Sequence, residues 1–560
     1  MSHGMHFISL VALFYGAFAL ASSICPPTGP VLPPPHIPRN ASWSGITDVL
    51  NAFVQDSEGD GWNASINSFS VVATSAEDTF FRYHYTAPLK DEMGVKTVDD
   101  DTVYSVASIT KVFTVLAVLL EDRLDLDAPI GKYVKELDTL EWKDVTLRLL
   151  TTQTAAIPRD GYMFDHAPDA SELMELGFPG LRPSDIPPCG LSPGSRMCSR
   201  EELFDSFSEF NFTGVIGDRV AYSDLAYILL GYALEDVTGL PYEQVLQKSI
   251  FEPLGLKDTS GPPPDGSRMI VPIDSASWVG VDWAYFSKTA GLYSTPNDLS
   301  VFIRAILNNV LLSRVRTNEW LKPAAFTSQL DNSVGAPWEI FRPTTLTNGS
   351  RPIDHYTKSG DVPGFSSSYL VLVPEYNVGV SILGAGPDAS TFVPLLLDTV
   401  QAALIPMLEE MARMQAAKEY TGQYEWKAGN ESSVISLGVD DGPGLKVSGW
   451  TKGAIDMLKS FDVAMFGSIS EDAVPPDVRL YPIGADDRWY VDFTEQDKGP
   501  SSQRKKPGAL RGSACMPWYR VDGFHYGKVR IDEVMFRRGE EGVVEGVEVP
   551  VLRESFQRVR

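Results

Sequence analysis

The spacing of apolar residues changes once along this chain, and that change limits the folds it can adopt. Between about residues 45 and 405, stretches with helical spacing of apolar residues alternate with stretches that have strand spacing. Apolar residues recur at helical intervals in 112–120, and a hairpin of buried strands is predicted at 369–374 and 378–383. The rest of the chain consists of short β-rich runs separated by Gly, Pro and Asp. We therefore expect an α/β (α+β) domain at 45–405 and an all-β domain, a sandwich or barrel, at 420–560.

Two further segments complete the predicted organisation. Residues 22–44 are rich in proline and should lie extended on the surface. Residues 398–418 have the pattern of a long helix that leads out of the first domain, with 406–419 as the linker. The total length of 560 residues fits two or three domains of ordinary size.

The N-terminus carries an uncharged apolar run at 7–21 that ends in Ala19-Leu20-Ala21. The run is too short to span a bilayer comfortably, and small residues at its end suit signal-peptidase cleavage. We expect a signal peptide at 1–21, with an uncleaved anchor as the alternative. The mature protein would then be secreted or reside in the secretory-pathway lumen, with no membrane span after cleavage.

Glycosylation signals and cysteines fit that route. Five Asn-x-Ser/Thr sequons are candidate glycosylation sites, at Asn40, Asn63, Asn211, Asn348 and Asn430. Cys189 and Cys198 flank a Gly/Pro-rich loop and are candidates for a disulfide, and Cys25 with Cys515 would tie the two ends together, although sequence leaves the connectivity open. Because no Cys-x-x-Cys or Cys/His cluster occurs, we expect no metal site.

The charge balance narrows the choice of partner. The chain has 73 Asp plus Glu against 47 Lys plus Arg, a net charge of −26. So acidic a protein repels phosphate backbones and anionic lipid, which disfavours nucleic acid and membrane surfaces as partners. The oligomeric state is left open.

The strongest chemical signal is Ser108-Ile-Thr-Lys111, which opens the most apolar helix of the chain. A serine and a lysine three residues apart on a helix share one face, and burial would lower the pKa of the lysine so that it can take the serine proton. A second Ser-x-x-Lys, Ser502 to Lys505, lies in a Gly/Pro-rich basic loop, where nothing would hold or desolvate the pair.

Two weaker motifs follow in order. Tyr222-Ser-Asp224 precedes a helical run, and a tyrosine beside an ammonium can have a lowered phenol pKa and act as general base or proton relay. Lys358-Ser359-Gly360 precedes the predicted hairpin, where a small glycine lets a substrate approach and a lysine attracts a carboxylate.

Taken in this order, the three motifs resemble the serine β-lactamase and penicillin-binding-protein superfamily. Four flanking stretches are similar to its class C β-lactamase and esterase branch: 119–130, 146–154, 250–259 and 290–299. The resemblance covers about 45–405 and implies an antiparallel sheet flanked by helices with a helical subdomain. The β-rich tail resembles the lipocalin-like domain of some relatives, and secreted fungal lactamase-like hydrolases fit the signal peptide and sequons best.

The resemblance also implies roles for individual residues. Ser108 would be the acylated nucleophile, Lys111 its base partner and Tyr222 the relay to the leaving group. Lys358 would grip an acid group of the substrate, and the oxyanion hole would use the backbone N–H groups of Ser108 and Asp361. Substrate contacts would come from Asp224, Ser359, Gly360 and Asp361.

Two departures from the family pattern argue against β-lactam substrates. Position 224 is Asp where the family usually has Asn, and a carboxylate there could hold the neighbouring lysines charged. The stretch Gln153-Thr-Ala-Ala156 replaces His-Thr-Ser-Gly. Neither change touches the nucleophile.

The sequence therefore predicts a secreted serine acyl hydrolase that acts through a Ser108 acyl-enzyme on an ester, amide or thioester of a small molecule or peptide. The resemblance implies neither a metal nor an organic cofactor. One alternative is an acyltransferase of the same fold that passes the acyl group to a small-molecule acceptor, as in secondary metabolism. Another is a non-catalytic binding protein that has kept the fold.

Overall fold

The structure is a computed structural model that describes residues 26–190, 196–207, 209–262, 265–347, 351–466, 477–484, 486–494 and 521–559. The chain divides into two compact units. The larger contains Pro33–Thr347 and Pro352–Ala412, and the smaller is built mainly from Arg413–Arg560.

The centre of the larger unit is an eight-stranded sheet in the order β2-β1-β10-β9-β8-β7-β6-β5, in which every pair of neighbours is antiparallel. The predicted hairpin is confirmed as β9 and β10, which pair from Val378↔Val373 to Ala385↔Ser366. The strands are β1 Ser68–Ser75, β2 Thr79–Tyr85, β5 Ala325–Phe326, β6 Asn332–Val334, β7 Glu339–Phe341, β8 His355–Val362, β9 Ser366–Val373 and β10 Val378–Ala385, and β3 Tyr104–Ser105 pairs separately with β4 Tyr293–Ser294.

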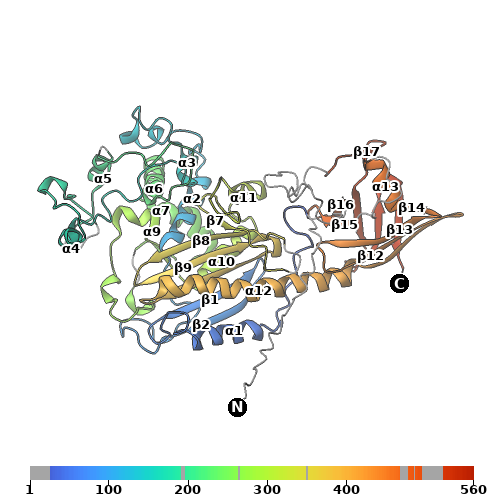
Figure 1. The fold of residues 1–560 in the computed structure, drawn as a ribbon, viewed down its shortest axis with the longest axis horizontal. Coiled ribbons are helices and arrows are strands. Elements are labelled where there is room, and N and C mark those ends of the chain that lie inside the picture. The colour runs from blue at the N-terminus through green and yellow to red at the C-terminus, as the bar shows by residue number, and fades with distance from the viewer. Residues whose placement is uncertain are drawn as a thin grey trace, which may run out of the picture. The chain divides into compact units, whose positions relative to one another are not determined.

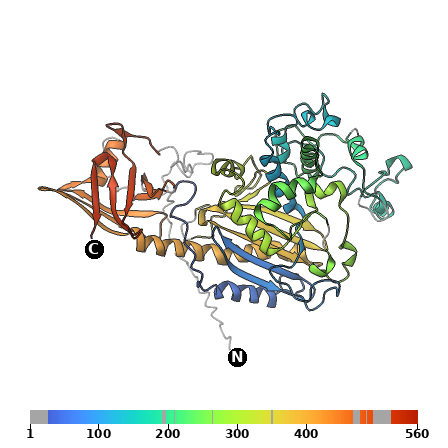
Figure 2. The same ribbon diagram turned by 180° about the vertical axis from the view of Figure 1, so that it is seen from behind.

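Helices cover both faces of this sheet. On one face lie α1 (Ser44–Gln55) and α12 (Ala389–Tyr420), whose apolar residues share a core with β1, β9 and β10 (Figure 1). The other face is covered by α10 and the helical part of the unit, as the view from behind shows (Figure 2). These helices are α2 Thr110–Leu120, α3 Leu147–Thr151, α4 Ala170–Glu175, α5 Arg200–Ser206, α6 Asp224–Thr238, α7 Tyr242–Leu246, α8 Glu252–Leu254, α9 Ser287–Ala290, α10 Pro296–Leu307 and α11 Arg314–Trp320. The expected antiparallel sheet with flanking helices and a helical subdomain is therefore present.

Helix α12 is longer than the sequence predicted, because it begins at Ala389 rather than at 398. Its first turns bury Phe392, Val393 and Leu396 against the sheet, and this packing holds Pro394 within the helix. Among the described residues, α12 is the one helix long and apolar enough to cross a membrane. Part of its apolar surface is buried in the core of the larger unit.

The smaller unit contains a closed barrel of eight antiparallel strands, which confirms the predicted all-β, lipocalin-like domain. Each strand pairs with the next along the barrel, and β21 closes it by pairing with β11. Trp450, Trp489, Phe536 and Phe556 fill its core. The barrel strands are β11 Gly422–Ala428, β12 Glu431–Gly438, β13 Leu445–Lys452, β15 Asp477–Pro482, β16 Arg488–Thr494, β19 Glu533–Arg538, β20 Val544–Val549 and β21 Glu554–Arg558, with β14 Ile455–Asp456, α13 Met457–Phe466, β17 His525–Tyr526 and β18 Val529–Arg530 beside them.

The structure joins Cys189 and Cys198 in a disulfide, as the sequence predicted. Cys25, Cys515, Asn348 and the predicted signal peptide at 1–21 lie outside the described residues. The other four sequon asparagines are exposed: Asn40, Asn63, Asn211 and Asn430.

Candidate active site

Ser108 lies in a short 3₁₀ turn, Ala107–Ile109, that leads from β3 into α2. Ala107 has a φ of +45°, a left-handed conformation that costs an alanine roughly 1–2 kcal/mol. The turn is held by backbone bonds from Val106 N to Leu292 O (3.0 Å) and from Ile109 N to Val106 O (3.1 Å). The surrounding structure thus fixes the nucleophile candidate at the start of a buried helix.

Lys111 lies one turn further along and meets Ser108 as the motif predicted. Its Nζ donates to Ser108 Oγ at 2.7 Å, and its side chain is 0% exposed. Burial lowers the pKa of Lys111, whereas the nearby Asp224 carboxylate opposes that shift. A lysine with a lowered pKa is suited to accept the Ser108 proton.

Asp224 is the first residue of α6 and forms an ion pair with Lys111. Lys111 Nζ donates to Asp224 Oδ1 at 2.6 Å, and Thr289 Oγ1 donates to the same oxygen at 2.7 Å. Burial alone would raise the pKa of Asp224, but Lys111 and the hydrogen bonds to this carboxylate lower it overall. The residue that departs from the family pattern is therefore a charged partner of the proposed base.

Tyr222 OH donates to Ser108 Oγ at 2.9 Å, so Ser108 receives hydrogen bonds from two side chains. The expected lowering of the Tyr222 pKa is wrong: burial raises that pKa, and the opposing effect of Lys358 is smaller. Tyr222 is therefore a neutral phenol at physiological pH. It is suited to donate a proton rather than to act as the resting general base.

Strand β8 carries Lys358, Ser359, Gly360 and Asp361 past the nucleophile. A Cβ at Gly360 would lie 2.2 Å from Val106 O and 3.0 Å from Ser108 N, so only glycine allows this approach. The Asp361 side chain accepts a hydrogen bond from Ser390 Oγ at 2.7 Å. The backbone N–H of Asp361, next to Gly360, is the group that the resemblance assigns to the oxyanion hole.

Two carboxylates that the sequence analysis did not single out belong to this site. Glu339, on β7, contacts Lys358 Nζ at 2.5 Å. Asp160 faces Asp224, and its pKa is raised to about 7 by burial and by the Asp224 carboxylate. Oδ1 of Asp160 is buried and accepts no hydrogen bond from any described residue, which suits the protonated acid. Neither residue lies in a sequence motif. Strand register brings Glu339 to the site, and a loop contact brings Asp160 there.

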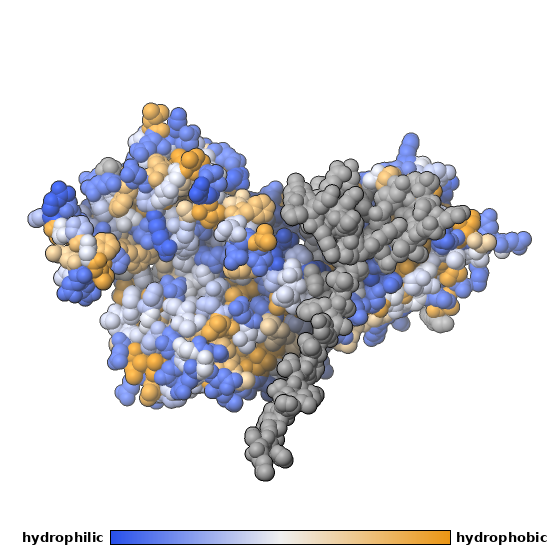
Figure 3. Space-filling view, viewed as in Figure 1, coloured by the Kyte–Doolittle hydropathy of each residue, from blue (hydrophilic) through white to orange (hydrophobic). Residues whose placement is uncertain are grey.

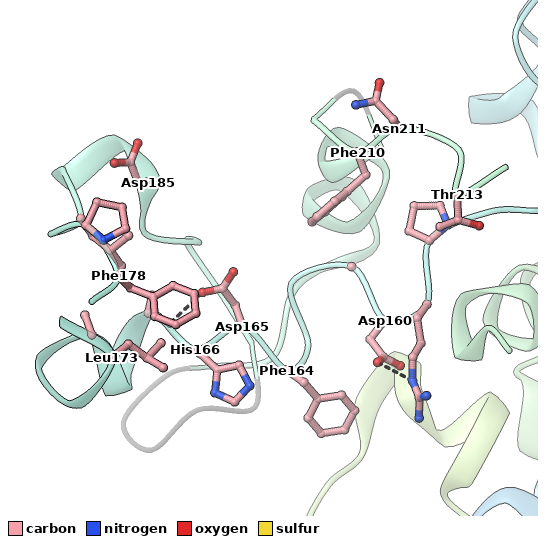
Figure 4. Close-up of a pocket in the computed structure, with 17 residues that line it drawn as sticks. Asp160, Phe164, Asp165, His166, Leu173, Phe178, Asp185, Phe210, Asn211 and Thr213 are labelled. Carbon is pink, nitrogen blue, oxygen red and sulfur yellow. Dashed lines mark hydrogen bonds and ion pairs between the residues drawn. The ribbon is translucent and has the colours of Figure 1, made fainter. Parts of the chain in front are cut away.

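A pocket of about 860 Å³ lies beside Asp160 (Figure 4). Arg159 and Asp160 line it, and the guanidinium carbon of Arg159 lies 4.9 Å from the centre of the Tyr222 ring. Its other walls are largely apolar and include Phe164, Leu173, Phe178 and Phe210. Exposed apolar residues also gather around α4 in the space-filling view (Figure 3), among them Met174, Leu176 and Phe178.

Comparison with known proteins agrees with this geometry. A family model described as Beta-lactamase matches residues 60–400. This chain belongs to the beta-lactamase family. A second model, described as the C-terminal domain of Beta-lactamase-like-like proteins, matches residues 412–560 of this family member.

Relatives of this beta-lactamase-family chain include fungal and bacterial proteins. A Beta-lactamase-like protein of Arthroderma benhamiae is 30% identical and covers 97% of each chain. A Probable hydrolase, clz13, of Cochliobolus lunatus is 28% identical over 79% of this chain and 75% of its own. The D-alanyl-D-alanine-carboxypeptidase/endopeptidase AmpH of Escherichia coli is 25% identical over 50% of this chain and 71% of its own. In general terms, the chain is a beta-lactamase-like serine hydrolase.

Proposed function

We propose that this protein is a secreted serine acyl hydrolase in which Ser108 forms the acyl-enzyme. The observation that carries the proposal is the double hydrogen bonding of Ser108 Oγ by Lys111 Nζ and Tyr222 OH. The substrate would be an ester, amide or thioester of a small molecule or peptide. The pocket beside Arg159 has largely apolar walls, and Arg159 in turn lies over the Tyr222 ring, which supports a small organic acyl donor.

The contacts support a two-step mechanism. Neutral Lys111 takes the proton of Ser108 as Oγ attacks the carbonyl carbon, and the backbone N–H groups of Ser108 and Asp361 bind the developing oxyanion. Tyr222 gives its proton to the leaving group, and the Lys111 ammonium returns a proton to Tyr222. Water, deprotonated by the same groups, then attacks the acyl-enzyme and releases the acid.

The two alternatives have less support. A binding protein would not need Lys111 and Tyr222 directed at one serine, with a strained turn holding that serine in place. An acyltransferase would use the same acylation step and differ only in the acceptor. The two enzyme classes separate in one assay, because hydrolysis yields the free acid and transfer to an added alcohol yields a new ester.

The proposal is tested by the intact mass of the protein after incubation with a fluorophosphonate. We expect one covalent adduct on the wild type and none on Ser108→Ala, because only an activated serine reacts. Ser502→Ala, which removes the serine of the second Ser-x-x-Lys, is the matched control and should keep the adduct. An adduct on folded Ser108→Ala would contradict the assignment. Secretion is tested separately by expression in a fungal host, where the mature protein should begin near Ser22.

A further inference from the structure

The carboxylate of Glu339 lies where the family resemblance would put an acid group of the substrate. We propose that Glu339 fills the acid-binding position on β8, so that the enzyme acts on acyl donors whose leaving group carries no carboxylate. This inference rests on the proposed function and names its substrate class. It replaces the role that the sequence analysis gave to Lys358, which was to grip a substrate acid.

The Glu339 carboxylate accepts hydrogen bonds from the three donors of Lys358 and Ser359 at this position. Glu339 Oε1 accepts from Lys358 Nζ at 2.5 Å and from Ser359 Oγ at 2.9 Å. Glu339 Oε2 accepts from the backbone N–H of Ser359 at 2.9 Å. A substrate carboxylate would need the same ammonium, hydroxyl and N–H, and these are already satisfied within the protein.

The backbone of Glu339 is fixed by pairing between β7 and β8. Glu339 is opposite Thr357 in the ladder, and Thr357 Oγ1 donates to Glu339 O at 2.8 Å. The preceding Trp338 is 0% exposed. A substrate acid that displaced the Glu339 side chain would leave two carboxylates close together beside one buried lysine, which is unfavourable.

The charges around Tyr222 point the same way. Two lysine amino groups and one guanidinium lie over its ring, with Lys111 Nζ at 5.0 Å, Lys358 Nζ at 5.5 Å and the Arg159 guanidinium carbon at 4.9 Å from the ring centre. Two of these groups have a carboxylate partner within the protein: Lys111 pairs with Asp224, and Lys358 pairs with Glu339. Paired cations attract an anionic substrate less strongly than free ones.

The position of Lys358 also indicates which part of the substrate would be recognised at this position. Its ammonium lies against the ring of Tyr222, the residue that would protonate the leaving group. A group that reaches Lys358 therefore belongs to the leaving-group side of the scissile bond. Glu339 would therefore select among substrates on that side.

The test compares two esters that differ only in this acid, phenyl butyrate and 3-carboxyphenyl butyrate. We expect wild type to have a kcat/KM at least tenfold higher for the neutral ester. Glu339→Gln, which removes the charge and keeps the shape, should reduce that ratio by about tenfold. Glu319→Gln, the same change at an exposed position on α11, is the matched control and should leave the ratio unchanged.

The outcomes separate this inference from the proposed function. A wild type that prefers the acidic ester overturns the inference without need of any variant, and so does a folded Glu339→Gln with an unchanged ratio. If neither ester is hydrolysed and no fluorophosphonate adduct forms on Ser108, the proposed function itself fails and the inference falls with it. An adduct together with preference for the acidic ester overturns the inference alone.

Discussion

At the scale of single residues, the proposed chemistry depends on how strongly Lys111 holds its proton. Burial favours the neutral amine, and the Asp224 carboxylate at 2.6 Å favours the ammonium. Acylation needs the neutral form, whereas the ion pair stabilises the charged one. This opposition makes Asp224 the residue that sets the working pH of the site.

Asp224→Asn should therefore raise the rate of hydrolysis at neutral pH. Loss of the carboxylate lowers the pKa of Lys111, and each unit of decrease gives roughly tenfold more neutral amine below that pKa. The rising limb of the kcat/KM–pH profile should move to lower pH. Asp298→Asn, at a buried aspartate on α10, is the control and should not move that limb. Unchanged or lower rates in folded Asp224→Asn would remove this explanation.

Asp160 gives a prediction on stability. Its pKa of about 7 in the folded protein lies above the ordinary value of 3.8, so the folded state binds the extra proton between these two pH values. Stability contributed by this group is lost as pH rises from about 4 to about 7. Asp160→Asn does not titrate and should be more stable than wild type at pH 8, by about 2–4 kcal/mol, but not at pH 4.

Urea unfolding at pH 4 and pH 8 measures this difference. Asp48→Asn, at an exposed position on α1, provides the control for a generic Asp-to-Asn effect. An Asp160→Asn advantage that is the same at both pH values would show that the carboxyl is not the group responsible.

At the scale of elements, the close passage of β8 beside the 3₁₀ turn makes Gly360 essential. Gly360→Ala would place a Cβ 2.2 Å from Val106 O and 2.6 Å from Ser368 Oγ, so strand or turn must shift. Since a displacement of about 1 Å can cost a hundredfold in rate, we expect kcat/KM to fall by about that factor. Gly45→Ala meets nothing within 4 Å and should keep full activity. A folded Gly360→Ala with wild-type kinetics would contradict the proposed geometry.

Local motifs and strand register explain which residues of the site could be predicted from the sequence. Ser108, Lys111, Tyr222 and Lys358 were predicted together because each lies in a local motif whose order is informative. Glu339 carries no motif and reaches the site through the register of β7 on β8. A slip of one residue would turn its side chain to the other face of the sheet, and single-sequence patterns do not determine register.

Asp160 was missed, and the start of α12 was predicted too late, for related reasons. Asp160 reaches Asp224 through a loop that is held by a bond from Leu225 N to Arg159 O at 3.0 Å, a contact distant in sequence. The pattern at 398–418 did not reveal the earlier start of α12, where packing of Phe392 and Leu396 on the sheet stabilises the first turns and holds Pro394 within the helix. In both cases tertiary contacts override the local pattern.

At the scale of the whole molecule, the two units have separate hydrophobic cores. Phe302 belongs to the core of the larger unit, where it stacks on Phe113 at 4.1 Å, and Phe556 belongs to the core of the barrel. Both side chains are 0% exposed. Because each core is formed within one unit, we expect two unfolding transitions in calorimetry rather than one.

A matched pair of substitutions tests that expectation. Phe556→Ala should destabilise the barrel by about 3–5 kcal/mol and lower only one Tm, whereas Phe302→Ala should lower only the other. The fluorophosphonate adduct, which needs an intact Ser108 site, should disappear with the transition that Phe302→Ala shifts and persist through the one that Phe556→Ala shifts. If either substitution lowers both transition temperatures equally, the two units unfold as one cooperative structure. Helix α12 would then couple them, because it runs without interruption from Ala389 to Tyr420. The barrel would then contribute directly to the stability of the catalytic site.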